Sequence, residues 1–246
     1  MKIILSPAKK MVRADDDFSY ESLPVFLEES EQLLAYLKSY DYAQLKKIWN
    51  CSDALARTNQ QRLEEMDLRN GLSPALFTYS GLAYQHMAPG AMTQRQLDYL
   101  RSHLCILSGF YGVLKPFDGV VPYRLEMQAT LPDTGALYDY WKDRIYKEVT
   151  KDGGVILNLA SKEYSRCVES YLSENDTMIT AVFAEVRNGK PLTKGTMAKM
   201  ARGEMTYWLS ENEIIDVHEI RRFDAGYAYS ELLSTETEYV FVRKNP

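Results

Sequence analysis

Short apolar runs recur along the chain and predict strands that are buried on both faces. Each run is three to eleven residues long and ends at polar or turn-forming residues, which is typical of strands inside a sheet covered by helices. The predicted strands are Lys2–Leu5, Leu104–Leu107, Val155–Leu157, Met178–Val186, Glu213–Phe223 and Tyr239–Arg243.

Apolar residues at helical spacing lie between these runs. Residues 14–37 hold seven acids and no basic residue, which predicts a helix with a solvated acidic face. Further helices are predicted within Leu45–Met66 as a pair broken near Ser52, from Ser73-Pro74 onward, and over Thr93–Ser102, Tyr138–Val149 and Thr196–Leu209. Ser52 and Ser161 are expected to cap the helices that follow them. Strands alternating with helices predict an α/β fold, a mixed sheet flanked by helices.

Length and composition fit one globular domain. With 246 residues, of which 46% are hydrophobic and 26% charged, the chain can bury a sizeable core. We expect a single domain over residues 1–246, with a helical sub-region at about 20–102. Three scattered cysteines are typical of a reducing compartment, and no run of about 18 apolar residues occurs. The expected location is the cytoplasm, with no membrane partner.

Polar loops follow three of the predicted strands. They cover Ser6–Lys10, Ser108–Gly112 and Asn158–Tyr164. Ligands of α/β sheets bind beyond the carboxyl ends of strands, so these loops predict a charged cleft there. A helix beginning at Ser161 would present its positive end to an anion. The alternative is that Ser161 only caps its helix and that the glycines only form turns.

A proline-flanked loop after the second of these strands is dense in charge. It contains Asp118, Tyr123, Arg124 and Glu126. Arg124 can bind a carboxylate or phosphate through two hydrogen bonds. Glu126 can act as an acid or base if burial raises its pKa. The alternative is an internal pair of Arg124 and Glu126 that pins the loop.

Residues 187–203 form the clearest basic run in a chain of net charge −5. Its cations, with no acid among them, are Arg187, Lys190, Lys194, Lys199 and Arg202. Lys199 and Arg202 are three residues apart and therefore share one helix face. With Lys9 and Lys10 they can form a positive cleft for phosphates. The alternative is a solvated helix face.

Motif searches reveal no cofactor or metal site. The chain has no GxGxxG, Walker, GxSxG or HExxH sequence, and its three histidines stand apart from one another. We therefore expect no cofactor and no metal ligands.

Six segments, taken in order, resemble the YaaA family of bacterial peroxide stress response proteins. They are Ile4–Lys9, Leu107–Pro116, Pro122–Met127, Asn158–Tyr164, Lys199–Gly203 and Phe223–Tyr227. The resemblance implies protection from hydrogen peroxide by limiting free intracellular iron. It also implies DNA binding of low sequence specificity through a positively charged cleft, with a helix-hairpin-helix element.

The resemblance assigns roles to particular positions of this chain. The cleft would consist of Lys9, Tyr123, Arg124, Asn158, Ser161, Lys199 and Arg202. The hairpin would fall within Ala43–Met66, although no glycine stands between its helices. Gly81-Leu82-Ala83-Tyr84 also departs from the Gly-Asp-Val-Tyr of many relatives.

A second hypothesis is an enzyme that acts on a nucleotide or nucleobase in the same cleft. Arg124 and Lys199 would hold phosphate, and Glu126 or Glu163 would serve as acid or base, with Asp118 as a further candidate. Acids beside basic residues motivate this hypothesis, because a phosphate clamp has little need of carboxylates.

Overall fold

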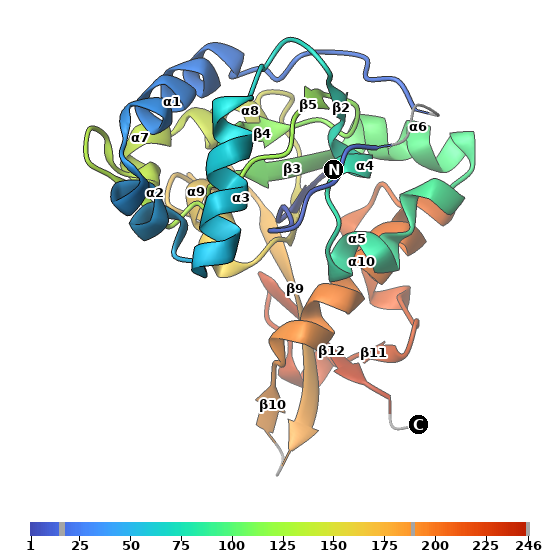
Figure 1. Ribbon diagram of the computed structural model, residues 1–246. Coiled ribbons are helices and arrows are strands. Elements are labelled where there is room, and N and C mark those ends of the chain that lie inside the picture. The colour runs from blue at the N-terminus through green and yellow to red at the C-terminus, as the bar shows by residue number, and fades with distance from the viewer. Residues whose placement is uncertain (15–17, 188–189, 245–246) are drawn as a thin grey trace.

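Five parallel strands form the centre of an eight-stranded mixed sheet (Figure 1). The computed structural model describes residues 1–14, 18–187 and 190–244. The sheet order is β11-β12-β9-β8-β1-β3-β4, and β10 pairs with β9. The strands are β1 (Lys2–Leu5), β3 (Leu104–Ser108), β4 (Gly112–Leu114), β8 (Ile156–Leu159), β9 (Met178–Arg187), β10 (Lys190–Leu192), β11 (Tyr227–Tyr229) and β12 (Glu238–Arg243). Two small ladders join β2 (Ser73–Pro74) to β5 (Gly119–Val120) and β6 (Thr130–Leu131) to β7 (Gly135–Ala136).

Helices flank this sheet, which confirms the predicted fold class. They are α1 (Leu27–Ser39), α2 (Tyr42–Trp49), α3 (Asp53–Glu64), α4 (Ala75–Thr78), α5 (Leu82–Met87), α6 (Gln94–His103), α7 (Leu137–Trp141), α8 (Arg144–Thr150), α9 (Lys162–Glu169) and α10 (Gly195–Glu211). Three short 3₁₀ helices cover Pro89–Ala91, Val217–Arg222 and Glu231–Leu233. None of the helices in the described ranges is long and apolar enough to cross a membrane.

Strand β1 lies at the centre of the sheet and sets the position of the site. Ile4 pairs with Cys105 of β3 on one side and with Asn158 of β8 on the other. Ile3 and Leu5 are also buried, because helices cover both faces of the strand. Since β3, β1 and β8 are parallel, their carboxyl ends meet at one edge of the sheet, and the three polar loops begin there.

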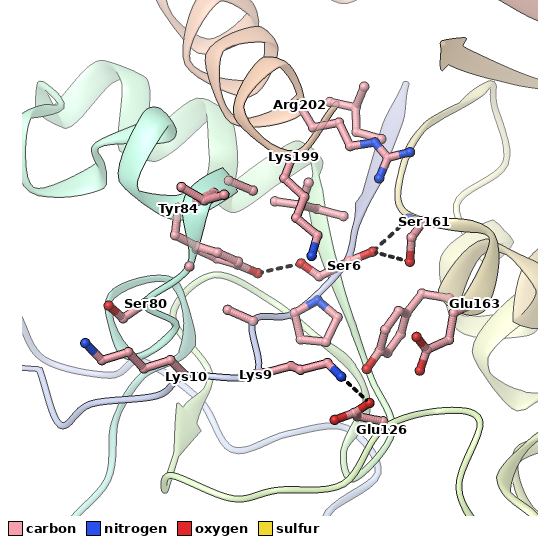
Figure 2. A pocket seen from close by; sticks show the side chains of 18 of the residues that line it. Ser6, Lys9, Lys10, Ser80, Tyr84, Glu126, Ser161, Glu163, Lys199 and Arg202 are labelled. Carbon is pink, nitrogen blue, oxygen red and sulfur yellow. Dashed lines mark hydrogen bonds and ion pairs between the residues drawn. The ribbon is translucent and has the colours of Figure 1, made fainter. Parts of the chain in front are cut away.

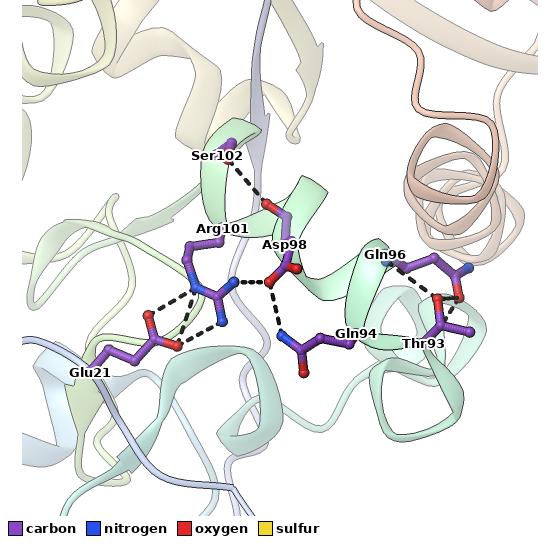
Figure 3. A network of polar contacts seen from close by, with 7 residues as sticks. All are labelled: Glu21, Thr93, Gln94, Gln96, Asp98, Arg101 and Ser102. Carbon is purple, nitrogen blue, oxygen red and sulfur yellow. Dashed lines mark hydrogen bonds and ion pairs between the residues drawn. The ribbon is translucent and has the colours of Figure 1, made fainter.

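A polar network fastens the segment before α1 to helix α6 (Figure 3). The Arg101 guanidinium binds the Glu21 carboxylate, with an Nη2–Oε1 distance of 2.7 Å, and also contacts Asp98. Thr93 and Gln96 form a capping box at the start of α6. These contacts give α6 a defined beginning and tie down the chain that leads into α1.

The strand predicted over Glu213–Phe223 is wrong. Ile214, Val217, Ile220 and Phe223 are buried at intervals of three residues, and the segment from Val217 to Arg222 forms a 3₁₀ helix. The Asp216 carboxylate accepts a hydrogen bond from the backbone N–H of His218 and starts this helix. A three-residue interval places side chains on one face of a 3₁₀ helix, whereas a strand needs an interval of two.

Three predicted helices have different bounds. The helix predicted within residues 14–37 begins only at Leu27, as α1. The helix expected over Tyr138–Val149 divides into α7 and α8, because Lys142 adopts a φ of 47° and cannot continue a right-handed helix. Ser73 and Pro74 form strand β2, so the helix that follows begins only at Ala75.

Candidate functional site

A cavity of about 330 Å³ opens at the carboxyl ends of β1 and β8 (Figure 2). Segments far apart in the sequence line it: the loop after β1, helix α5, residues 123–126, the start of α9, and α10. Of the residues singled out from the sequence, those that line it are Lys9, Lys10, Tyr123, Arg124, Glu126, Ser161, Glu163, Lys199 and Arg202. The cavity therefore gathers the loops after β1 and β8, the proline-flanked loop and the basic helix around one space, whereas none of residues 108–112 of the predicted loop after β3 lines it.

Glycine allows two of the cavity walls to approach closely. A Cβ atom at Gly203 of α10 would lie 2.0 Å from the carbonyl oxygen of Ala83 in α5. A Cβ atom at Gly109 would lie 2.6 Å from the carbonyl oxygen of Leu125. Any other residue at either position would push backbone away, so these two glycines set the places of α10 and of residues 124–126.

Lys199 and Arg202 form a cationic end of the cavity together with Ser6 and Ser161 (Figure 2). In the described part of the chain, neither cation pairs with a carboxylate, unlike Lys9 and Lys194. The Arg202 Nε atom is buried without a hydrogen-bond partner there, and burial lowers the pKa of this guanidinium. Cations held in place without a counter-charge are suited to bind an anion.

Ser6 joins the end of β1 to the start of α9. Its Oγ accepts a hydrogen bond from the Ser161 N–H at 2.8 Å and donates to the Ser161 Oγ at 3.2 Å. Ser161 stands at the N-cap position, but its side chain makes no capping hydrogen bond, nor does that of Ser52 before α3. The expected side-chain caps are therefore wrong, and the Ser161 hydroxyl faces the cavity instead.

Glu126 marks the opposite, acidic end of the cavity. Its carboxylate lies 2.7 Å from Lys9 Nζ and 2.5 Å from Arg124 Nη2. The Arg124 and Glu126 side chains are only 14% and 15% exposed, whereas Lys9 is 63% exposed. The internal Arg124–Glu126 pair is thus confirmed, and it holds residues 124–126 while both side chains still line the cavity.

Glu163 is the second carboxylate of the acidic end and is half-buried. Burial raises its pKa, and the neighbouring Glu126 raises it further, whereas hydrogen bonding to Gln128 and the charge of Lys9 act in the opposite direction. The hydrogen bond from the Gln128 N–H is long, at 3.4 Å. Glu163 therefore retains capacity to accept hydrogen bonds from a ligand or to carry a proton.

Replacing Glu163 with glutamine is expected to raise thermal stability slightly at pH 7. A carboxyl whose pKa is raised by folding destabilises the folded state when ionised, and this penalty disappears as the pH falls toward the usual value of 4.5. Melting temperatures of both proteins between pH 4 and 8 test this. The difference in melting temperature should shrink toward pH 4. A difference that grows there would contradict a raised pKa for Glu163.

Hydrogen bonds of Tyr123 and Asn158 hold segments around the cavity in place. The Tyr123 hydroxyl bonds with those of Tyr79 at 2.9 Å and Ser108 at 2.6 Å, and burial raises the pKa of Tyr123 to about 12. The Asn158 side chain accepts from the Ala160 N–H and is itself buried. Asn158 shapes the loop after β8 and is not among the residues that line the cavity.

Asp118 lies apart from the cavity. Its carboxylate is buried and accepts hydrogen bonds from Ser22 Oγ at 2.6 Å and from the Lys115 N–H at 2.8 Å. Burial raises its pKa, but its contacts fasten the segment around Ser22 to the loop before β5. The structure thus places this candidate in a supporting position.

The basic run divides into two parts. Glu185 of β9 pairs with Lys194 at 2.8 Å and with Arg187 at 3.7 Å, on the hairpin that extends beyond the sheet (Figure 1). The side chain of Lys190 lies outside the described residues. Lys199 and Arg202 are the members of the run that reach the cavity.

Several lining residues were not singled out from the sequence. Ser6 and Tyr164 belong to the polar loops predicted from the sequence. Their positions near Lys9 and Glu163 in those loops could therefore have identified them as lining residues. Ser80 carried no such signal. Tyr84 ends the Gly81–Tyr84 segment noted in the family resemblance, but its place at the cavity follows from the packing of α5 on α10. The Tyr84 hydroxyl donates to the Ser6 carbonyl oxygen at 3.1 Å.

The helical pair expected within Ala43–Met66 is present as α2 and α3. Asn50 adopts a φ of 41° and makes the turn between them without glycine. Asp53, at the start of α3, binds Lys46 at 2.9 Å and Arg57 at 3.1 Å. Lys46 and Arg57 thus already have a counter-charge, whereas the exposed Lys47 has none among the described residues. The Asp53 carboxylate lies at the start of α3, where a phosphate would approach.

Comparison with known proteins identifies the family. The family model described as peroxide stress protein YaaA matches residues 1–233. A UPF0246 protein of Agathobacter rectalis is 49% identical over 99% of both chains. UPF0246 proteins of Lachnoclostridium phytofermentans and Pediococcus pentosaceus are 47% and 46% identical over 99% of this chain and 96% and 98% of their own. The chain therefore belongs to the peroxide stress protein YaaA family, also called UPF0246.

Proposed function

We propose that this peroxide stress protein binds DNA, with phosphate held at the cationic end of the cavity. The observation that carries the proposal is the pair of Lys199 and Arg202, which line the cavity without a carboxylate partner among the described residues. Lys9, Lys10 and Arg124 line the same cavity and add positive charge. Arg and Lys side chains supply most phosphate contacts in complexes with nucleic acid.

The cavity is a better phosphate site than the hairpin of α2 and α3. Lys46 and Arg57 are both bound to Asp53, so a phosphate would have to displace that carboxylate. No such competition arises at Lys199. Because phosphate contacts carry no sequence information, DNA binding here is expected to show low sequence specificity and strong salt dependence.

Replacing Lys199 with alanine is expected to weaken DNA binding about tenfold at low salt and to reduce the slope of log K against log salt by about 1. Lys199 is exposed, so its loss should leave folding intact. Fluorescence anisotropy with a labelled duplex at several salt concentrations measures both quantities.

Lys151→Ala is the matched control, because Lys151 lies with Lys2 at the opposite edge of the sheet. Equal affinities for the two variants would place the DNA elsewhere on the protein. Absence of DNA binding by the unmodified protein at low salt would refute the proposal.

The effects on peroxide resistance and free iron are proposed to follow from DNA binding. Most charged groups that line the cavity are cations, which repel iron ions. Burial raises the pKa of Cys105 to about 11 and of Cys167 to about 12, so neither thiol forms the reactive thiolate near neutral pH. Direct reduction of peroxide by these two cysteines therefore receives no support.

An enzyme that acts on a nucleotide or nucleobase is the second candidate function. The half-buried Glu163 favours it, because a raised pKa beside bound phosphate is typical of a general acid or base. An enzyme of this kind with Glu163→Gln should retain its nucleotide and lose turnover. A pure DNA-binding protein should show no product with any nucleotide, as judged by chromatography of the reaction mixture.

A further inference from the structure

The cavity has two chemically different ends (Figure 2). Lys199, Arg202 and the hydroxyls of Ser6 and Ser161 occupy one end, where the lining includes no carboxylate. Glu163 and the Lys9–Glu126 pair occupy the other. A uniformly cationic cleft would suit a run of phosphates, whereas this arrangement suits a ligand with an anion at one end and N–H donors at the other.

The walls between the two ends suit a flat ring. Tyr84 and Tyr164 line the cavity together with Pro7 and Leu82, so aromatic and apolar surface accompanies the charged groups. Aromatic side chains stack on nucleobases of every kind. The cavity volume of about 330 Å³ is at the low end of the range of roughly 300–1,000 Å³ that holds small ligands.

The two carboxylates at the acidic end are not equivalent. The Glu126 carboxylate has two cations within ion-pair distance, Lys9 at Oε2 and Arg124 at Oε1, although Oε1 has no hydrogen-bond partner in the described structure. Glu163 has one long hydrogen bond from the Gln128 N–H, pairs with no cation among the described residues and faces the cavity (Figure 2). Glu163 is therefore the carboxylate whose charge is left for a ligand, and two adjacent N–H donors, as on the pairing edge of guanine, match its two oxygens.

We infer that the cavity receives one nucleotide, with its phosphate at Lys199 and Arg202 and the N–H edge of its base at Glu163. The inference rests on the proposed DNA-binding function only where that nucleotide belongs to DNA. A stacked duplex cannot place a base in so small a cavity, so the nucleotide would be unpaired or turned out of the helix.

Titration calorimetry of the full-length protein with free nucleotides tests the inference. The probes are dGMP, dTMP, deoxyguanosine and inorganic phosphate. We expect dGMP to bind at least tenfold more tightly than deoxyguanosine or phosphate alone, because only dGMP engages both ends. We also expect dGMP to bind about tenfold more tightly than dTMP, whose pairing edge offers one N–H donor.

Two substitutions test which end of the cavity binds the phosphate and which end binds the base. Lys199→Ala should weaken the binding of dGMP about tenfold and leave the binding of deoxyguanosine unchanged. Glu163→Gln should remove the preference for dGMP over dTMP. Lys151→Ala serves as the control and should bind all four probes like the unmodified protein.

The outcomes separate the two proposals. Nucleotide binding of this pattern without DNA binding would support the inference and refute the DNA proposal. DNA binding weakened by Lys199→Ala, with no nucleotide binding tighter than that of phosphate, would overturn the inference and leave the DNA proposal standing. Equal nucleotide affinity in the Lys199→Ala and Lys151→Ala proteins would also overturn it.

Discussion

Replacing Gly203 with alanine is expected to destabilise the protein by roughly 3 kcal/mol, near the upper end of the usual cost of an added core methyl group. The new Cβ atom would lie 2.0 Å from the Ala83 carbonyl oxygen and 3.0 Å from the Met87 nitrogen. Both are backbone atoms of α5, so no side-chain rotation relieves the clash, and α10 must move. For a chain of this size, the melting temperature should fall by roughly 6–12 °C.

Gly195→Ala provides the control for this prediction, because Gly195 begins the same helix and a Cβ atom there would meet nothing within 4 Å. That change should be neutral or slightly stabilising, since alanine favours helix. Thermal unfolding followed by circular dichroism compares the two proteins. Similar melting temperatures would show that α5 and α10 are not held together as described.

Replacing Glu126 with alanine is expected to cost about 1–3 kcal/mol of stability, the usual cost of leaving a shielded polar group without its partner. Arg124 would lose the carboxylate 2.5 Å from its Nη2 atom, and its Nε is already buried without a hydrogen-bond partner in the described structure. Lys9, which is 63% exposed, would simply turn to solvent. Urea unfolding measures the loss.

The same change should tighten DNA binding at a temperature where the protein stays folded, because it removes one negative charge from the acidic end of the same cavity. Glu219→Ala is the comparison, since Glu219 pairs with Arg222 at 3.0 Å but is 48% exposed. Removal of an exposed pair should cost at most about 1 kcal/mol. If Glu126→Ala unfolds at the same urea concentration as Glu219→Ala, the pair does not pin residues 124–126.

The position of the site was predictable because three strands are continuous apolar runs. Such runs identify β1, β3 and β8, and parallel strands bring their carboxyl ends together. The loops containing Ser6, Gly109 and Ser161 therefore begin at one edge of the sheet, where those of Ser6 and Ser161 line the cavity. The wall formed by α5 was not predictable. It depends on a backbone contact between Gly203 and Ala83, which no local pattern encodes.

Contacts that the local sequence pattern does not show explain two further differences from the predictions. Residues 187–203 contain no acid, yet Leu192 pairs with Glu185 across a hairpin and brings that carboxylate to Lys194. Asp118 resembled a catalytic acid because its loop is rich in charge. Its partner Ser22 lies 96 positions away along the chain, and that distant contact turns the carboxylate from the cavity.

Ultraviolet cross-linking of DNA to the protein, followed by mass spectrometry of the peptides, tests the central claim most directly. The account predicts cross-links at Tyr84 or Tyr164, the aromatic walls of the cavity, and their loss in the Lys199→Ala protein. Cross-links confined to α2 and α3, or unchanged by Lys199→Ala, would contradict the assignment of the cavity as the nucleic-acid site.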